Sequence, residues 1–339
     1  MAPRGKIAVH HIGASGAAGL AAAAPEALAR LYRDAQRLYT PPAVFAGDLL
    51  SQRWLERSHN PYLDEIRAVQ AQLPGRGAYL LNMSYEWACT TSVAPDPGGI
   101  GMRLCRTLDW KLKGLGRTLI MARQSGPAGR YMNATWPGAV GIYTAMAPGR
   151  FAAAINQPPL RSHSPLTVPF DWLRARARQY AASDLPPSHL LRQVFDTCGD
   201  YATALQKLRD TPICLPVFFS LAGTERDEGC IIERTERDAV VHPAPAAIAN
   251  HWIALQQPGR PRGRDSKARH ACMLEAMTSR HMDFAWVQPP IRNRDTRVAA
   301  EMNPATGDFA LQGWEGDEPV TEILEMNETA PLQLDEQLG

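Results

Sequence analysis

The chain changes its pattern near residue 75, and this change restricts the folds open to it. Residues 24–39 repeat apolar side chains at helical spacing, and residues 49–73 continue a helical pattern with a break near Pro61. After residue 78 the apolar runs become short and are separated by Pro and Gly, which predicts strands. Helices and then further strands follow. This order favours a layered α+β fold over regular βαβ alternation.

The elements expected after residue 78 can be given by their ranges. A turn-forming Asn-Pro-Ala-Thr-Gly-Asp stretch separates the last two strands and predicts a hairpin. The predicted helices span residues 170–182, 187–209 and 266–279. The predicted strands span residues 91–93, 101–108, 117–122, 139–144, 151–156, 216–221, 230–234, 239–242, 297–302 and 309–312.

Composition excludes several classes of partner. The 339 residues carry 36 basic and 34 acidic side chains, a net charge of +2, so no strong field attracts nucleic acid or an anionic membrane. No apolar run reaches the roughly 18 residues of a membrane span, and the N-terminus lacks the plan of a secretory signal. We therefore expect no integral membrane segment and a cytoplasmic location. One basic cluster is interpreted as a solvated loop: Arg260, Arg262, Arg264, Lys267 and Arg269.

The cysteines and the missing motifs limit the chemistry. None of the six cysteines forms a Cys-x-x-Cys pair, so neither a zinc site nor a thioredoxin-like redox site is expected, and no metal or cofactor is predicted. Glycine-rich nucleotide loops and a Gly-x-Ser-x-Gly motif are missing as well. Most of the cysteines should be small buried apolar residues, and the question is whether one of them differs.

Cys89 is the cysteine whose surroundings suggest chemistry. It begins a predicted strand, and a turn at residues 95–99 would bring a second strand with Arg106 and Asp109 back beside it. A neighbouring cation favours thiolate over thiol, so it would lower the pKa of the cysteine and activate it. The structural alternative is a buried cysteine with a surface Arg and Asp nearby.

The segment around Cys89 resembles the acid ceramidase and N-acylethanolamine-hydrolyzing acid amidase family, relatives of bile-salt hydrolase and penicillin V acylase. That family typically shows Asn-x-x-Tyr-Glu before Cys-Thr-Ser, and then Arg-Asn-x-Asp. The matching residues are Asn82, Tyr85, Glu86, Cys89, Arg106 and Asp109. Four further matches follow in the family's order, at residues 138–151, 229–234, 249–252 and 265–269.

The resemblance implies a fold and an activation step. It implies a four-layer αββα sandwich of the N-terminal-nucleophile hydrolase type, with a helical N-terminal segment. It also implies autocatalytic cleavage between Ala88 and Cys89. Residues 1–88 would form a helical fragment and residues 89–339 the catalytic domain, and the two fragments would stay associated.

The resemblance also implies a hydrolase that acts on a linear carbon–nitrogen (amide) bond. The new α-amino group of Cys89 would serve as the general base, since its ordinary pKa is about 7.7–8.0. Arg106 would polarise the thiolate and Asp109 would hold the new ammonium. Asn250 would donate to the oxyanion, a contact worth roughly 2.7–4 kcal/mol, and Arg269 would brace the site. The substrate would be a small lipophilic N-acyl amide.

Two departures from the family pattern stand close to the expected site. An extra threonine gives Cys89-Thr90-Thr91-Ser92, which predicts a longer or bulged hairpin. Asn156 and Gln157, expected to bind substrate, replace the family's Asn-Glu. Gln157 offers hydrogen bonds without a charge, so the resemblance does not extend to a preference for ethanolamine or sphingosine amides.

Three alternatives remain open from the sequence. The same scaffold could transfer the acyl group or act as a penicillin-type acylase, and a substrate panel separates these activities. A catalytically degenerate relative could serve as a binding protein that never cuts itself. A papain-like protease would need a base histidine and a Cys-Gly-Ser-Cys-Trp context, and neither is present.

Overall fold

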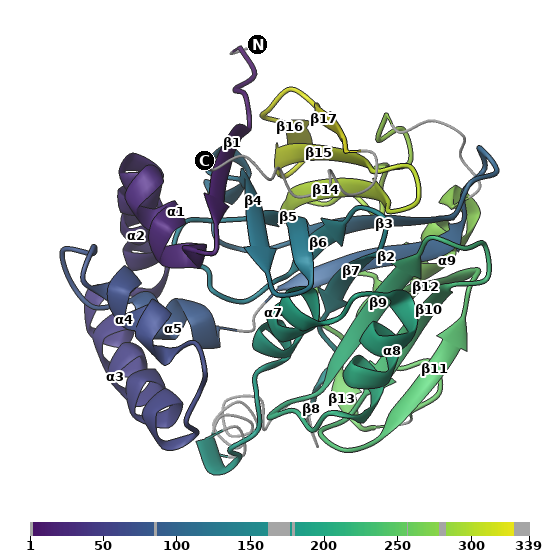
Figure 1. Ribbon diagram of the computed structural model, residues 1–339. Coiled ribbons are helices and arrows are strands. Elements are labelled where there is room, and N and C mark those ends of the chain that lie inside the picture. Colours follow the sequence, from purple (N-terminus) through teal and green to yellow (C-terminus); the bar gives the residue numbers. More distant parts are fainter. Residues whose placement is uncertain are drawn as a thin grey trace, which may run out of the picture.

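Two β-sheets lie face to face, and helices cover their outer sides (Figure 1). The computed structural model describes residues 3–84, 87–161, 177, 180–255, 257–277 and 283–328. This layering is the four-layer αββα sandwich expected from the sequence. In the described residues, no helix combines the length and the apolar character that crossing a bilayer requires.

The first sheet has eight strands in the order β1-β4-β5-β6-β7-β9-β10-β11. Its strands pair antiparallel except at the β1 edge, where β1 runs parallel to β4. The strands are β1 (Ala8–Gly13), β4 (Ile120–Gly126), β5 (Gly129–Thr135), β6 (Thr144–Ala147), β7 (Phe151–Asn156), β9 (Val217–Gly223), β10 (Gly229–Arg234) and β11 (Ala239–Pro243).

The second sheet has seven strands in the order β12-β2-β3-β14-β15-β16, with β17 also paired to β15. A short third sheet joins β8 (Leu160–Arg161) and β13 (Gly259–Arg260). The strands of the second sheet are β2 (Ala88–Pro95), β3 (Met102–Asp109), β12 (Ala246–Ile248), β14 (Thr296–Asn303), β15 (Asp308–Glu315), β16 (Glu318–Pro319) and β17 (Leu324–Asn327).

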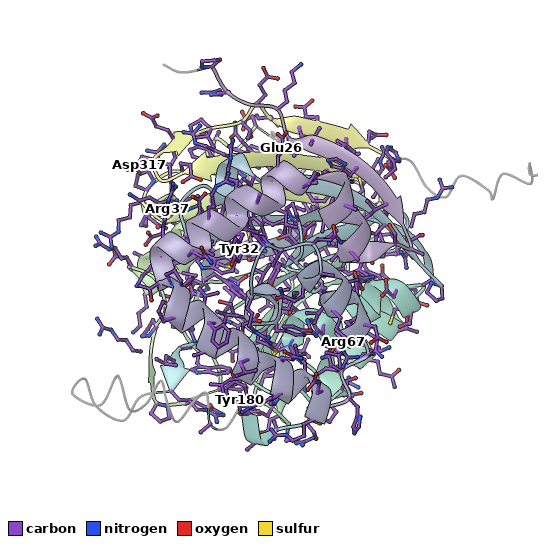
Figure 2. All side chains as sticks on the ribbon, turned by 90° about the vertical axis from the view of Figure 1, so that its left-hand side faces the viewer. Glu26, Tyr32, Arg37, Arg67, Tyr180 and Asp317 are labelled. Carbon is purple, nitrogen blue, oxygen red and sulfur yellow. The ribbon has the colours of Figure 1, made fainter. Side chains whose placement is uncertain are left out.

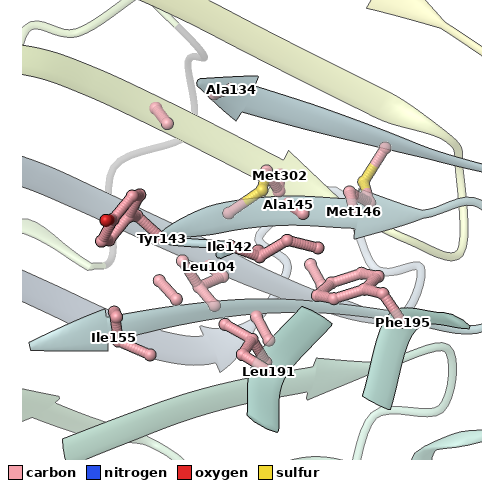
Figure 3. Close-up of a cluster of buried hydrophobic side chains, with 14 of the residues drawn as sticks. Leu104, Ala134, Ile142, Tyr143, Ala145, Met146, Ile155, Leu191, Phe195 and Met302 are labelled. Carbon is pink, nitrogen blue, oxygen red and sulfur yellow. The ribbon is translucent and has the colours of Figure 1, made fainter. Parts of the chain in front are cut away.

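The main apolar core fills the space between the two sheets and continues between the first sheet and the helix at Pro187–Thr197. Leu104 on β3 and Met302 on β14 belong to the same buried cluster as Ile155 on β7 and Phe195 beneath the first sheet (Figure 3). All four side chains are buried. Alternate residues of each strand point into this layer, so the position of a residue along its strand decides which layer it joins.

The helices divide between the two sides of the sandwich and an N-terminal group. Helices α7 and α8 pack on the first sheet, and α9 packs on β2 and β12 of the second. The N-terminal helices form a group of their own at one side (Figure 1). The helices are α1 (Gly16–Ala23), α2 (Pro25–Tyr39), α3 (Pro41–Arg57), α4 (Leu63–Gln70), α5 (Ala78–Met83), α7 (Pro187–Thr197), α8 (Tyr201–Asp210) and α9 (Ser266–Ala276), with a 3₁₀ turn at Leu115–Arg117.

Most elements expected from local patterns are confirmed, including α2, β7 and the β14–β15 hairpin. The single helix predicted over 187–209 is wrong. Asp200 accepts a hydrogen bond of 2.8 Å from the backbone N–H of Thr203 and so starts a new helix, α8. The helix predicted over 170–182 lies largely outside the described residues.

Two other predictions differ from the structure: the strand over residues 139–144, where a distant residue decides the conformation, and the bulge in the hairpin after Cys89. Residues 139–143 do not form a strand, because the backbone N–H of Val140 donates to Asn82 Oδ1 at 2.7 Å. The hairpin of β2 and β3 has no bulge despite the extra threonine, since the register runs unbroken from Ala88 opposite Asp109 to Pro95 opposite Met102.

Glu301 is a fully buried carboxyl on the outer face of the second sheet. Its Oε1 accepts hydrogen bonds from Trp286 Nε1 at 2.8 Å and from the backbone N–H of Phe284 at 3.2 Å. Arg103 lies 3.9 Å from Oε2. Burial outweighs these contacts and raises the pKa of Glu301 from 4.5 to about 7.

The raised pKa of Glu301 predicts a pH-dependent stability. The folded state holds this proton more tightly than the unfolded state, so the free energy of unfolding should fall as the pH rises from 4.5 to about 7. We expect Glu301→Gln to remove this decline. Between pH 5 and pH 8 its free energy of unfolding should therefore rise by up to about 3 kcal/mol relative to that of the unmodified protein. Urea unfolding at both pH values measures the effect, with Glu318→Gln on β16 as the exposed control. Equal pH dependence of Glu301→Gln and the unmodified protein would contradict it.

Candidate active site

Cys89 lies near the start of β2, at the edge of the space between the two sheets. Its thiol points into the inter-sheet core, and the residue is 0% exposed. Ala88, one position earlier, points to the opposite face of the sheet and is 6% exposed. The peptide bond between them is therefore closed off from solvent in the uncut chain.

Arg106 on β3 contacts the thiol directly. Its Nη2 donates to Cys89 Sγ at 2.7 Å, and its Nη1 donates to the carbonyl oxygen of Tyr143 at 2.6 Å and to the hydroxyl of Thr144. Nη2 also lies 3.4 Å from the carbonyl oxygen of Ile155. The guanidinium is fully buried, and apart from the thiol each of these acceptors is neutral. A thiolate at Cys89 would be the natural counter-charge for it.

The protonation state of the thiol differs from the simple expectation. Burial raises the pKa of Cys89 from 9.0 to about 11, while Arg106 and Arg269 act in the opposite direction. The expectation that Arg106 would bring the pKa below its ordinary value is thus wrong for the uncut chain. Complete desolvation outweighs one adjacent cation, and sequence spacing does not report desolvation.

The backbone on each side of Cys89 is held by side chains from the far end of the chain. The N–H of Cys89 donates to Asn250 Oδ1 at 3.1 Å, and Arg269 Nη1 donates to the carbonyl oxygen of Cys89 at 2.7 Å. Arg269 Nη2 donates to the same Asn250 Oδ1 at 2.8 Å. Asn250 Nδ2, the expected oxyanion donor, donates at 2.7 Å to the carbonyl oxygen of Gln157. Before cleavage, the amide of Asn250 therefore serves to fix the scissile bond.

Asp109 lies on the other face of β3 from Arg106, because it stands three positions further along the strand and side chains alternate between the faces. Its carboxylate accepts hydrogen bonds from Asn293 Nδ2 at 2.8 Å and Thr296 Oγ1 at 3.0 Å, and it lies 3.8 Å from Arg269. Burial raises its pKa above the ordinary 3.8. The hairpin brings both residues beside Cys89, as expected from the sequence, but on opposite faces of the sheet. Arg106 contacts the thiol, while Asp109 lies opposite Ala88 and its charge acts to raise the pKa of the thiol.

Asn156 and Gln157 take different positions at the end of β7. Asn156 Oδ1 accepts from Thr91 Oγ1 at 2.7 Å, and its Nδ2 contacts the carbonyl oxygens of Ile248 and Ala249 at 3.3 and 3.2 Å. Its polar groups thus tie β7 to β2 and to the residues before Asn250. Gln157 Oε1 is buried and accepts no hydrogen bond from the described residues.

Two supporting residues, Asn293 and Thr296, were not predicted from the sequence. They donate to Asp109, and no local motif marks them because they lie more than 180 positions from it along the chain. Ser266, inside the matched stretch 265–269 but given no role there, accepts the N–H of Asn250 at its Oγ at 2.8 Å. Asn82 was singled out as a motif residue, and its Nδ2 donates at 3.0 Å to the carbonyl oxygen of Gly138, which fixes the segment that leads to Tyr143.

An apolar cavity of about 450 Å³ lies beside the segment that leads to Cys89. Ser84 and Trp110 line it, and the Trp110 ring lies 5.3 Å from the ring of Trp87, two residues before Cys89. Of the four pocket candidates from the sequence, Trp110 lines this cavity, while Met102, Trp136 and Met146 are buried in the inter-sheet core. Figure 2 faces the helical side and labels two lining residues, Tyr32 and Tyr180. Other lining residues are Leu28, Leu31, Val44, Gly47, Leu50, Leu80, Leu81 and Leu112.

Comparisons with known proteins agree with the fold. No protein-family model matches the chain. It is 26% identical over 220 residues to a probable acid ceramidase of Caenorhabditis elegans, covering 58% of this chain and 53% of that protein. It is 26% identical over 180 residues to the N-acylethanolamine-hydrolyzing acid amidase of Cavia porcellus, covering 51% and 48% respectively.

The chain thus spans about half the length of the curated relatives it matches. A solved structure of a Caenorhabditis elegans N-acylethanolamine-hydrolyzing acid amidase ortholog superposes with a TM-score of 0.50 at 19% identity, covering 64% of this chain and 93% of that one. That likeness shows a shared fold. Taken with the sequence matches, it makes the chain similar in sequence and in fold to acid ceramidase and N-acylethanolamine-hydrolyzing acid amidase.

Proposed function

We propose that this chain cuts itself before Cys89 and then hydrolyses the amide bond of a lipophilic N-acyl amide with Cys89 as the nucleophile. The observation that carries the proposal is the environment of Cys89. Its thiol receives a hydrogen bond of 2.7 Å from Arg106, while its backbone N–H is held at 3.1 Å by Asn250 Oδ1. Both reacting groups of one residue are thereby oriented by separate buried side chains.

The self-cleavage step balances within the chain and one water molecule. The sulfur of Cys89 attacks the carbonyl carbon of Ala88, the C–N bond breaks, and the thiol proton passes to the nitrogen of Cys89. Water then hydrolyses the resulting thioester, which releases the carboxyl group of Ala88 and the thiol. Because the thiol pKa is about 11 in the uncut chain, only a small thiolate fraction is present at neutral pH.

The hydrolytic step uses the amine that cleavage frees. An α-amino group with a pKa near 7.7–8.0 can take the thiol proton as the sulfur attacks the substrate carbonyl. It then gives that proton to the leaving amine, and water hydrolyses the acyl thioester to the carboxylic acid. The products are one amine and one acid, with one water consumed.

The contacts of the residues around Cys89 indicate the role of each in the proposed reaction. Arg106 would stabilise the thiolate, and Asn250 Nδ2 would turn from Gln157 to the developing oxyanion. Arg269 would hold Asn250 and the carbonyl of Cys89 in place. Asp109, next to Arg269 and opposite Ala88, is close enough along the sheet to attract the new ammonium.

The apolar cavity supports a lipophilic acyl group. Its volume of about 450 Å³ lies within the usual range for small-molecule pockets. Trp110 lines it, and the Trp110 ring lies 5.3 Å from the ring of Trp87, two residues before Cys89. An acyl chain held in the cavity would reach the thiol past this pair of tryptophans.

The two fragments should stay together after the cut. Residues 1–88 supply β1, which pairs with β4 inside the first sheet, as well as buried Leu31 and Trp87 in the main core. We expect intact-mass analysis to find two species divided between Ala88 and Cys89. Gel filtration without denaturant should elute both in one peak, and urea should separate them.

A chain that stays whole after long incubation at mildly acidic and neutral pH would contradict self-cleavage. It would favour a binding protein that has lost the reaction. Acyl transfer on the same scaffold is tested by adding a second amine during turnover. Transfer then yields a new amide, whereas hydrolysis yields the free acid. The cytoplasmic location stays a prediction from the sequence.

Asp109→Asn tests the role given to that carboxylate. The amide keeps the shape and can still accept from Thr296, but it cannot neutralise an ammonium. We expect both the self-cleavage rate and kcat/KM to fall about tenfold to a hundredfold, less than on loss of the nucleophile. A time course of intact mass and a steady-state assay measure them. Asp308→Asn, at the first residue of β15, is the control. An unchanged rate would remove Asp109 from the mechanism.

A further inference from the structure

A cluster of exposed cations lies in the segment that packs against Ala88, the residue before Cys89. We call residues 259–267 the basic loop. Arg260, Arg264 and Lys267 are exposed, and none of the three has an ion-pair partner among the residues that the structure describes. Asp265 supplies the one carboxylate within the same stretch. Exposed cations at this density usually lie on an ordinary solvated surface, so their position relative to Cys89 decides whether they matter.

The basic loop packs directly against the residue that precedes the nucleophile. Gly263 has φ +69°, and a Cβ added to it would lie 2.7 Å from the Cβ of Ala88. The carbonyl oxygens on both sides of Gly263 accept from Arg269, that of Arg264 at 2.8 Å and that of Arg262 at 3.2 Å. The backbone of the loop is thus fixed against the scissile bond by the buried arginine that also holds Cys89.

The basic loop also reaches the end of β7. Arg262 Nε donates to the carbonyl oxygen of Pro158 at 3.2 Å. The first two residues of the loop, which form β13, pair with β8, two positions after Pro158. The loop therefore extends from α9 to the residues after Gln157. The N–H of Cys89 is held by Asn250. Asn250 in turn accepts from Arg269, which holds the α9 end of the loop, and donates to the carbonyl oxygen of Gln157, just before the other end.

The chemistry of the reaction determines which part of a substrate lies next to the basic loop. The leaving amine takes its proton from the α-amino group of Cys89, so its nitrogen must lie beside that group. Gln157, whose backbone carbonyl accepts from Asn250, is 3% exposed, and its Oε1 is an acceptor without a partner among the described residues. It can accept the N–H of the scissile amide. Whatever the amine carries would then extend toward the basic loop, which packs against Ala88.

We infer that the preferred substrates are N-acyl amides whose amine part bears a carboxylate, that is, N-acyl amino acids. This inference rests on the proposed amide hydrolysis at Cys89. Three cations without ion-pair partners would attract the carboxylate, and the neutral Gln157 adds no repelling charge. The apolar cavity takes the acyl chain at one end, and the basic loop takes the anionic group at the other.

Three amides with one dodecanoyl chain and different amine parts test the inference: those of glycine, ethanolamine and ethylenediamine. With the self-cleaved protein, kcat/KM should be highest for the glycine amide, about tenfold above the ethanolamine amide, and lowest for the cationic one. The preference for glycine should shrink as salt rises from 0.05 to 0.5 M, since exposed charges are screened.

The variant Arg260→Gln/Arg264→Gln/Lys267→Gln removes the three charges without touching a buried contact of a side chain. It should lower the ratio of kcat/KM for the glycine amide over the ethanolamine amide about tenfold, mainly through KM. Arg4→Gln/Lys6→Gln/Arg130→Gln is the matched control, since it removes three exposed charges from other elements. It should leave that ratio unchanged.

The outcomes separate this inference from the proposed function. Hydrolysis of all three amides with a ratio near one, unaffected by the triple variant, overturns the anionic specificity and leaves the amidase standing. A fall in the ratio that the control variant reproduces also overturns it, because the net charge alone would then be responsible. If the cleaved protein hydrolyses none of a wider set of acyl amides, the proposed function itself fails.

Discussion

Cys89→Ala is expected to give a chain that stays whole and hydrolyses no amide. The substitution removes the atom that attacks in both reactions, so no remaining group can form the thioester. Loss of the nucleophile in a hydrolase lowers kcat on the order of a millionfold, which brings the rate close to background. Intact mass and turnover of an acyl-amide reporter measure the two losses in one preparation.

Cys105→Ala is the matched control for that experiment. Cys105 is another buried free cysteine, on β3 opposite Ser92, but its thiol faces the outer side of the sheet, away from Arg106. This variant should still be cut between Ala88 and Cys89 and should keep its activity within a few-fold. Turnover by Cys89→Ala at more than a few per cent of the normal rate would rule out the proposed nucleophile.

Arg106→Gln should be the second most damaging change. Arg106 is the cation in contact with Cys89 Sγ, and the pKa of the thiol already lies near 11 despite it. Without the guanidinium that pKa should rise further, so less thiolate forms at any given pH. We expect kcat/KM and the self-cleavage rate to fall about a hundredfold to a thousandfold, as on loss of a preorganised donor in an active site.

The pH profile separates an electrostatic role for Arg106 from a purely structural one. Alkylation of Cys89 by iodoacetamide should need a higher pH in Arg106→Gln, whereas Arg106→Lys, which keeps the charge, should recover part of the shift. Arg234→Gln is the control, because Arg234 is also buried and donates to the carbonyl oxygens of Leu208 and Thr211. A similar loss of activity in both arginine variants would contradict the assigned role.

The N-terminal segment illustrates the limit of prediction from local pattern. Helix α2 follows from the spacing of its leucines, whereas β1 went unrecognised within a segment expected to be mainly helical. β1 forms through parallel pairing of Ala8 with Ile120, more than a hundred residues away. Its short apolar sequence carries no signal of that partner, since a parallel edge strand depends on the sheet it joins.

The candidate site likewise contains features that local sequence pattern predicted and features that depend on tertiary packing. A turn at Pro95–Gly99 and two apolar runs were sufficient to predict the hairpin that brings Arg106 beside Cys89, because turn chemistry and alternation act within about twenty residues. The sides taken by Arg106 and Asp109 follow from the parity of their positions, which needed only the strand assignment. Asn250 and Arg269 were identified by family resemblance, and their contacts with Cys89 come from packing.

The amino-acid sequence therefore determined the order of helices and strands, the hairpin that carries the cysteine, and the residue types available for its chemistry. Only the tertiary structure decided that the thiol is fully desolvated, that Asn250 and Arg269 hold the backbone of Cys89, and that Gly263 brings the basic loop against Ala88. The physical reason is the separation along the chain between the residues that interact. Turn and helix preferences depend on neighbours along the chain, whereas desolvation and charge contacts depend on segments that meet only when the two sheets close on each other.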